Sequence, residues 1–211
     1  MADMKQSSFD SDTALPARPR ADLCLDFANT RSWRGRAAPH DDLGDFDRLI
    51  GWCVVAGAID AASGRMLAAW GRDHPVRATM MFGEALALRE TIYRLFDRRP
   101  DVPPQEDDLD RLNRALAKTP ARTTLRPTAG GLAWRVARLE PAAPSVLAAV
   151  LWSTADLLID PRRHRVRACA NAECRWVFLD DSKSGNRRWC AMSSCGNRAK
   201  AQRHYHRHKD R

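Results

Sequence analysis

Four cysteines near the C-terminal end of the chain have the residue type and spacing of a metal site. They form two pairs with equal internal spacing, and fifteen residues separate Cys174 from Cys190. Zinc binds four ligands in a tetrahedron, and thiolates are its usual structural donors. Four cysteines complete that shell and leave no open position for a substrate. The pattern predicts one structural Zn²⁺ ion held by Cys169, Cys174, Cys190 and Cys195.

Two disulfide bonds are the alternative interpretation of these pairs. The chain does not open with a basic segment followed by an apolar one, so no secretory signal is visible. Paired cysteines in such a chain bind metal more often than they form bridges. The other two cysteines, Cys24 and Cys53, lie in apolar segments and are expected to be buried free thiols.

Basic residues gather around the cysteines and beyond them. The chain carries a net charge of +9, but residues 162–211 contain 14 basic and 4 acidic residues, a net charge of +10, which leaves −1 for residues 1–161. Such an asymmetry indicates a basic module that meets a polyanion, because Lys and Arg displace counterions from a duplex. The candidate nucleic-acid-binding residues are Arg175, Arg187, Arg188, Arg198, Lys200, Gln202, Arg203 and Arg207.

Other interpretations of the basic segment stay open at this point. A terminal helix can simply expose its charges to solvent, and a finger can dock on protein or RNA without reading a DNA sequence. Trp176 and Trp189 could stack on bases. A small metal-held module needs apolar mass, however, so core packing is the favoured role for both.

A second cluster of polar and aromatic side chains lies near the start of the chain, and it consists of Asp26, Asn29, Thr30, Trp33 and Arg34. Polar groups beside an apolar stripe can line a ligand pocket. They can equally cap a helix or satisfy backbone amides. No phosphate loop, nucleophile elbow or catalytic histidine spacing is visible, so no enzymatic activity is expected. An enzyme with a site around Asp26 and Asn29 is the less favoured alternative.

The elements that must position these residues fall into three parts. Residues 1–20 are polar and are expected to be a flexible lead-in. Residues 21–161 predict a mostly helical α+β domain with one small hairpin, and residues 162–211 predict a separate zinc finger. Apolar spacing and breakers predict helices over about 46–56, 61–70, 76–99, 107–118 and 145–159. The glycines at 130 and 131 lie between two alternating runs and predict a hairpin of 123–127 with 132–137.

Two segments before the first predicted helix carry weaker signals. Residues 23–30 fit either a strand or a helix, because eight residues are too few for periodicity to decide. Residues 31–42 contain Gly35 and Pro39 and predict a loop.

Within the finger, the sequence predicts the order of a treble clef: a cysteine knuckle, a hairpin, a second knuckle and a helix. The hairpin would pair 175–179 with 187–189, and the helix would run from about 196 to 208. About fifty residues are too few to fold readily without metal or disulfides. The zinc ion is therefore expected to supply the folding free energy of the finger.

The segment Cys195-Gly196-Asn197-Arg198 resembles the motif that names the CGNR zinc finger family. The upstream segments Cys169-Ala-Asn-Ala-Glu-Cys174 and Arg188-Trp189-Cys190 are similar to that family as well, and the resemblance covers about 165–208. The resemblance implies a treble-clef-like finger that binds DNA through its basic residues.

The run Leu23-Cys-Leu-Asp-Phe-Ala-Asn-Thr30 is similar to the opening motif of the ABATE domain, which usually precedes this finger. Residues 49–57 are similar to that domain more weakly. The ABATE domain is assigned to stress-induced transcription regulators of bacteria, so the resemblance implies a regulatory role.

Residues and resemblance together predict a bacterial, cytoplasmic transcription regulator. The finger would bind double-stranded DNA, while the N-terminal domain would sense a small-molecule effector or join a protein partner. No apolar run approaches the ~20 residues that span a bilayer, so no membrane association is expected. A homodimer would suit a DNA-binding protein, although no residue pattern demonstrates one.

Overall fold

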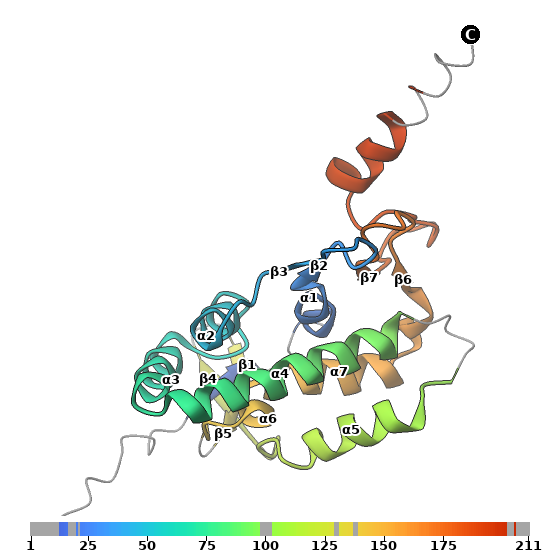
Figure 1. The fold of residues 1–211 in the computed structure, drawn as a ribbon. Helices are drawn as coiled ribbons and strands as arrows, with labels where there is room; N and C mark the ends of the chain where they lie inside the picture. The colour runs from blue at the N-terminus through green and yellow to red at the C-terminus, as the bar shows by residue number, and fades with distance from the viewer. Residues whose placement is uncertain are drawn as a thin grey trace, which may run out of the picture.

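The computed structural model describes residues 13–16, 20, 22–97, 103–128, 131–136, 139–201 and 205. They form a mostly helical body with a small C-terminal unit at one end (Figure 1). α1 (Leu23–Asn29) packs against both α4 (Pro75–Phe96) and α7 (Ala148–Ile159). The other described helices before the first cysteine pair are α2 (Phe46–Val55), α3 (Ala61–Asp73), α5 (Glu106–Leu116), α6 (Ala143–Val146) and the 3-10 helix η1 (Pro161–Arg165).

The segment 23–30, which periodicity left undecided, forms the helix α1. Five of its seven residues are buried, and Asp26 is the exposed one. A helix covered on nearly every side shows neither a 3.6-residue stripe nor clean alternation, so its sequence pattern is ambiguous. Cys24 and Cys53 are buried free thiols as expected, and burial raises the pKa of each to about 12.

The predicted helices are present, except that the one expected over 145–159 is divided at Leu147 into α6 and α7. Local signals set the starts of α2 and α3. Asp45 and Asp60 cap α2 and α3, where their carboxylates accept bonds from Arg48 N (2.8 Å) and Ser63 N (2.7 Å). α3 continues past the expected end at residue 70. Gly71 lies inside the helix because the close approach of Phe46 requires a residue without a side chain there.

The small antiparallel sheet contains one strand that the sequence did not predict. β4 (Thr124–Thr128) and β5 (Gly131–Val136) form the predicted hairpin. β1 (Thr13–Pro16) pairs with the other edge of β5, so the expectation of a flexible lead-in does not hold for these four residues. An open strand edge supplies the hydrogen-bonding partners that the lead-in lacks by itself. Except for Arg20, the rest of 1–20 lies outside the described residues.

The predicted loop over 31–42 contains a short ladder of its own. β2 (Arg31–Ser32) pairs with β3 (His40–Asp41), so residues 33–39 form the tip of a small hairpin. This tip reaches the C-terminal unit, where Gly35 N donates to Glu173 O (3.0 Å).

The finger has a different hairpin from the predicted one. β7 (Val177–Leu179) pairs with β6 (Val166–Ala168), which precedes the first cysteine pair, and 187–189 forms no strand. The expected pairing was wrong because the first knuckle itself serves as the turn that joins β6 to β7. The second cysteine pair runs into η2 (Met192–Gly196), a π turn, and the chain is helical from Asn197 to Ala201.

The core of the helical body extends into the finger. Val166, Val177 and Leu179 belong to the same buried apolar cluster as α1, α4 and α7. Phe178 points to the other side and is buried with Cys169, Cys174 and Cys195. None of the described helices has the length and apolar character needed to cross a bilayer.

Replacement of Gly71 with alanine tests the contact between α2 and α3. An added Cβ would lie 2.5 Å from Phe46 Cε1, so the buried Phe46 ring or one of the two helices must move. We expect Gly71→Ala to lower the free energy of unfolding by roughly 1–3 kcal/mol, measured by urea denaturation. Gly83→Ala in α4 is the control, since a Cβ there would meet no described heavy atom within 4 Å apart from its chain neighbours and the backbone of its own helix. That change should raise stability by about 0.5–1 kcal/mol; a gain in both variants would contradict the close contact.

Candidate metal centre and nucleic-acid interface

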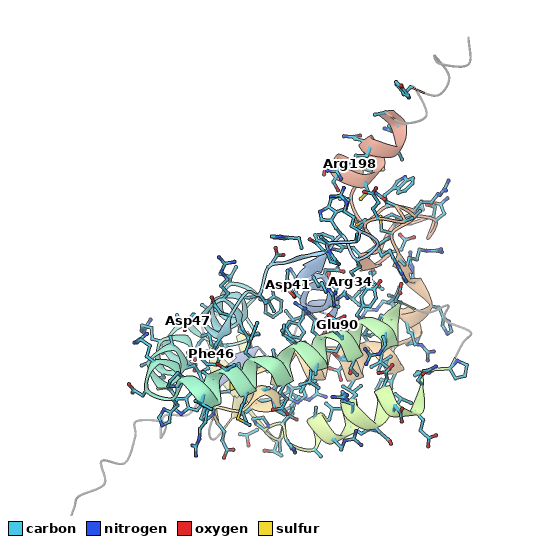
Figure 2. All side chains as sticks on the ribbon, in the orientation of Figure 1. Arg34, Asp41, Phe46, Asp47, Glu90 and Arg198 are labelled. Atoms are coloured by element: carbon cyan, nitrogen blue, oxygen red, sulfur yellow. The ribbon has the colours of Figure 1, made fainter. Side chains whose placement is uncertain are left out.

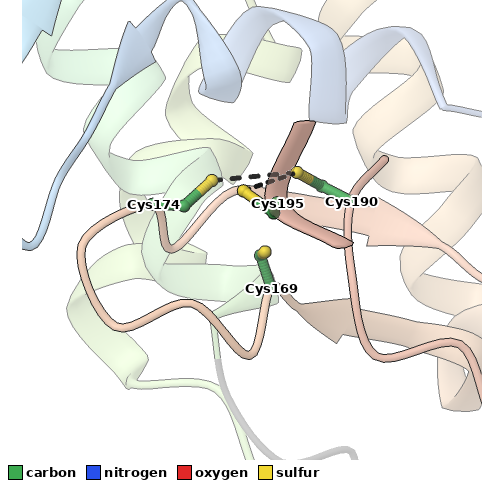
Figure 3. A group of neighbouring side chains, drawn as sticks. All are labelled: Cys169, Cys174, Cys190 and Cys195. Carbon is green, nitrogen blue, oxygen red and sulfur yellow. Dashed lines mark hydrogen bonds between the residues drawn. The ribbon is translucent and has the colours of Figure 1, made fainter. Parts of the chain in front are cut away.

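The four predicted zinc ligands converge on one point (Figure 3). Their sulfur atoms all lie within 4.8 Å of one another. Cys174 Sγ lies 3.7 Å from Cys190 Sγ, and Cys190 Sγ lies 3.9 Å from Cys195 Sγ. A tetrahedron with metal–sulfur bonds of about 2.3 Å has edges of about 3.8 Å. All four cysteines are free thiols, so the geometry fits a zinc shell and not two disulfides.

The electrostatics of this cluster favour a bound cation. The hydrogen bond from Cys190 lowers the pKa of the Cys174 thiol. The same bond raises the pKa of Cys190, while burial, with the nearby Cys174, raises the pKa of Cys195. One thiolate thus makes its neighbours harder to ionise. A divalent cation removes that conflict because it lets all four thiols lose their protons.

Short local contacts form the first knuckle. Cys169 N donates to Trp176 O (2.8 Å), and Cys174 N donates to Asn171 O (2.9 Å). The Asn171 side chain accepts from Glu173 N (3.0 Å) and donates to Cys195 Sγ (3.7 Å). Asn171 therefore tightens the turn and joins it to the second cysteine pair.

Asp180 organises the connection between the two knuckles, a role that the sequence analysis missed. Its carboxylate is buried and accepts bonds from Ser182 Oγ (2.5 Å), Ser182 N (3.1 Å) and Arg187 N (2.9 Å). The Ser182 hydroxyl and these amides hold the pKa of Asp180 below its usual value. The Asp-x-Ser spacing is a turn signal that could have identified it.

Asn29 joins α1 to the edge of β7. Its Nδ2 donates to Val177 O (2.8 Å), and its Oδ1 accepts from Val177 N (3.0 Å). The other edge of β7 pairs with β6. One side-chain amide thus replaces a neighbouring strand and satisfies both backbone groups of Val177.

Two more contacts join α4 to the first knuckle. The Tyr93 hydroxyl donates to Arg175 O (3.0 Å), and Arg175 Nη2 lies 2.7 Å from Asp97 Oδ2. Arg175 adopts a φ of +54°, so these contacts hold a backbone conformation that is rare for a residue with a side chain. Burial, with the nearby Asp97 carboxylate, raises the pKa of Tyr93 to about 12, which keeps its hydroxyl a donor.

A buried ionic cluster anchors the 31–42 hairpin to α4, and Figure 2 shows Arg34, Asp41 and Glu90 between α1 and α4. Arg89 is 2% exposed and contacts both oxygens of Asp41, at 2.7 and 2.6 Å. Burial raises the pKa of Asp41, but the bonds from Arg89 outweigh it and lower the pKa overall. Arg34 binds Glu90 (2.7 Å) and lies 3.8 Å from the centre of the Tyr93 ring.

The proposed ligand-pocket residues do not all meet. Asp26, Asn29 and Thr30 line an open hollow of about 380 Å³ together with Trp52 and Trp176. Trp33 and Arg34 do not line it. Trp33 packs against the cysteine cluster, and Arg34 belongs to the ionic cluster on α4.

The candidate nucleic-acid-binding residues differ in their contacts: some are bound to other groups of the protein, and others are exposed. The Arg175 side chain is paired with Asp97, and Arg187 donates to Trp189 O (2.8 Å) and to Cys190 O, so both also hold the fold. Arg188, Arg198 and Lys200 are exposed and have no acidic partner among the described residues. Gln202, Arg203 and Arg207 lie outside the described residues. Trp176 and Trp189 pack partly buried against the cysteine cluster, as expected.

The comparisons with known proteins identify two families. Residues 21–161 match the family model of ABATE, described as a putative stress-induced transcription regulator. Residues 165–208 match that of the CGNR zinc finger. No curated protein matches the chain. Neither description names an enzymatic activity, and the four cysteines fit one structural Zn²⁺ ion.

Removal of the metal should disturb more than the finger. A chelator or a Cys174→Ser change should abolish the one bound zinc per chain and expose Phe178. Because β7 is shared with the main core, we expect lost amide protection in α1 as well as in β6 and β7, measured by hydrogen exchange. Cys53→Ala is the control: it removes a buried thiol of α2 and should leave the zinc content at one. Full protection of β7 in the zinc-free protein would contradict the structural role of the ion.

Replacement of Asn29 tests the junction between α1 and β7. Asn29→Asp keeps an acceptor for Val177 N but places a carboxylate against Val177 O. We expect a loss of roughly 2–3 kcal/mol in the free energy of unfolding, with faster amide exchange at Val177. Asn113→Asp, at an exposed position of α5, makes the same change without that contact and should have little effect. Equal stability of the two variants would rule out the junction.

Proposed function

We propose that this chain, which belongs to the ABATE family and carries a CGNR zinc finger, is a transcription regulator that binds double-stranded DNA. The finger is the DNA-binding part, and its zinc ion is a scaffold and not a catalyst. The protein acts in the cytoplasm and has no enzymatic role in this proposal.

The distribution of uncompensated positive charge is the observation that carries the proposal. Most arginines in the described part of 162–211 bind carboxylates or backbone carbonyls, as Arg162 binds Asp160 and Arg167 binds Gly185 O. Arg188, Arg198 and Lys200 are exposed and without an acidic partner in the described part of the chain. Arg198 and Lys200 lie on the helical segment that projects away from the body (Figure 1). Such charges are available to phosphates of a duplex.

The N-terminal domain would supply the regulatory input. The hollow lined by Asp26, Trp52 and Trp176 lies where α1 meets β7. Trp176 Nε1 is buried and has no hydrogen-bond partner among the described residues. An effector or partner that occupies this hollow would contact both the helical body and the finger, and its binding would change the fluorescence of the two indoles.

Salt dependence tests the DNA-binding proposal. Three phosphate contacts give a slope of about −2.7 in log affinity against log salt, so affinity should fall on the order of 40-fold between ~50 and ~200 mM salt. The variant Arg188→Gln/Lys200→Gln should reduce the slope by about 1.8. Arg72→Gln/Lys118→Gln removes the same charge from an exposed position of α3 and from an exposed position just after α5, and it should not alter the slope.

The measurement is fluorescence anisotropy of a labelled duplex, first with mixed sequence and then with duplexes selected from random DNA. A zinc-loaded protein that binds no duplex at ~50 mM salt would refute the proposal. If the protein binds RNA or another protein and does not bind DNA, the finger is a docking module and not a DNA-binding one.

A further inference from the structure

An open groove of about 600 Å³ separates the first knuckle from the helix that follows Cys195. One wall comes from the knuckle and the other from the helix, and Trp189 and Cys195 lie between them. Two arginines reach this groove from distant parts of the chain. Arg198 belongs to the finger, whereas Arg36 belongs to the tip of the 31–42 hairpin in the N-terminal domain.

A single tryptophan supports both arginines. The Arg36 guanidinium carbon lies 4.0 Å from the centre of the Trp33 ring, and that of Arg198 lies 4.5 Å from it. Figure 2 shows Arg198 at the base of the projecting helix. Two cations that share one indole repel each other, and a bound anion would relieve that repulsion.

The position of the hairpin tip is fixed by its backbone. Trp33 adopts a φ of +55°, and Gly35 N donates to Glu173 O (3.0 Å). A Cβ at Gly35 would lie 1.8 Å from Ala172 O, so only glycine fits this approach. The tip is therefore docked on the first knuckle, and Arg36 is held at the groove.

The charges around the groove favour an anion. Glu173 is the acidic residue of its lining, and its carboxylate binds Arg36 at 2.8 Å. Arg198 has no acceptor among the described residues, and Arg188 lies 5.4 Å from the centre of the Trp189 ring, which also lines the groove. The lining of the groove thus has two guanidinium groups and one carboxylate, and Arg188 is nearby through Trp189. The groove is open at its surface, which suits a polymer that passes across it.

We propose that a phosphodiester group of DNA binds in this groove between Arg36 and Arg198, with Trp33 as the support of both. This inference rests on the DNA-binding function proposed above and adds a contact from the N-terminal domain. Glu173 competes with the phosphate for Arg36. The DNA-binding surface is then composite, and the hairpin tip is part of it.

The test measures binding of a labelled duplex by the full-length, zinc-loaded chain. Arg36→Gln and Arg198→Gln should each weaken affinity about tenfold and reduce the salt slope by about 0.9. Arg72→Gln on α3 is the charge-matched control and should bind as the unaltered chain does. Zinc content and thermal unfolding verify that each variant is folded.

Glu173→Gln distinguishes a carboxylate that competes with DNA for Arg36 from one that only holds the fold. It frees Arg36 and removes a negative charge from the groove, so we expect affinity to rise severalfold while Arg36→Gln lowers it. If Arg198→Gln weakens binding but Arg36→Gln matches Arg72→Gln, the inference is overturned and the DNA-binding finger stands. If the unaltered chain binds no duplex, the proposed function fails and the inference fails with it.

Discussion

The pairing of Asn29 with the edge of β7 is the interaction on which the arrangement of the two parts depends. A ladder of two three-residue strands is too small to be stable alone, and its buried edge needs hydrogen-bonding partners. The Asn29 amide provides a donor and an acceptor at once. Asn29 ends α1, and five other residues of α1 are buried in a helix that packs against α4 and α7, so the finger is attached to the core of the body.

The shared strand couples metal binding to the main core. Val177 and Leu179 face the helices, while Phe178 faces the cysteines, because successive side chains of a strand point to opposite sides. Loss of the ion therefore removes support from one face of β7, and the other face is part of the core of α1. The change of charge near residue 162 coincides with the boundary between the matched families, but the apolar core continues across it.

Features that depend on nearby residues could be predicted, and those that depend on distant partners could not. The cysteine ligands follow from their spacing, and the presence of the helices follows from apolar spacing, caps and breakers. The end of α3 does not, because Gly71 lies inside the helix against Phe46. The predicted strand pairing of the finger was wrong because the true partner of β7, the strand β6, lies before the first cysteine. The prediction considered only the residues between the two cysteine pairs. The ligand-pocket hypothesis for 26–34 stays a prediction. Asn29 and Arg34 instead contact residues that lie 148 and 56 positions away, Val177 and Glu90, and no local pattern indicates such partners.

The count of charged residues located the basic segment, but it could not show which of its arginines have an acidic partner and which do not. Arg175 and Arg198 look alike in the sequence, since both follow a zinc ligand within three residues. In the structure, Asp97 neutralises Arg175 at the junction with α4, whereas Trp33 holds Arg198 without neutralising it. An indole leaves the guanidinium donors free, so stacking orients a cation and keeps it able to bind an anion. The same indole also contacts Arg36, so the hairpin tip lies beside the basic helix, and the DNA contact that we propose for the N-terminal domain depends on how Arg198 is held.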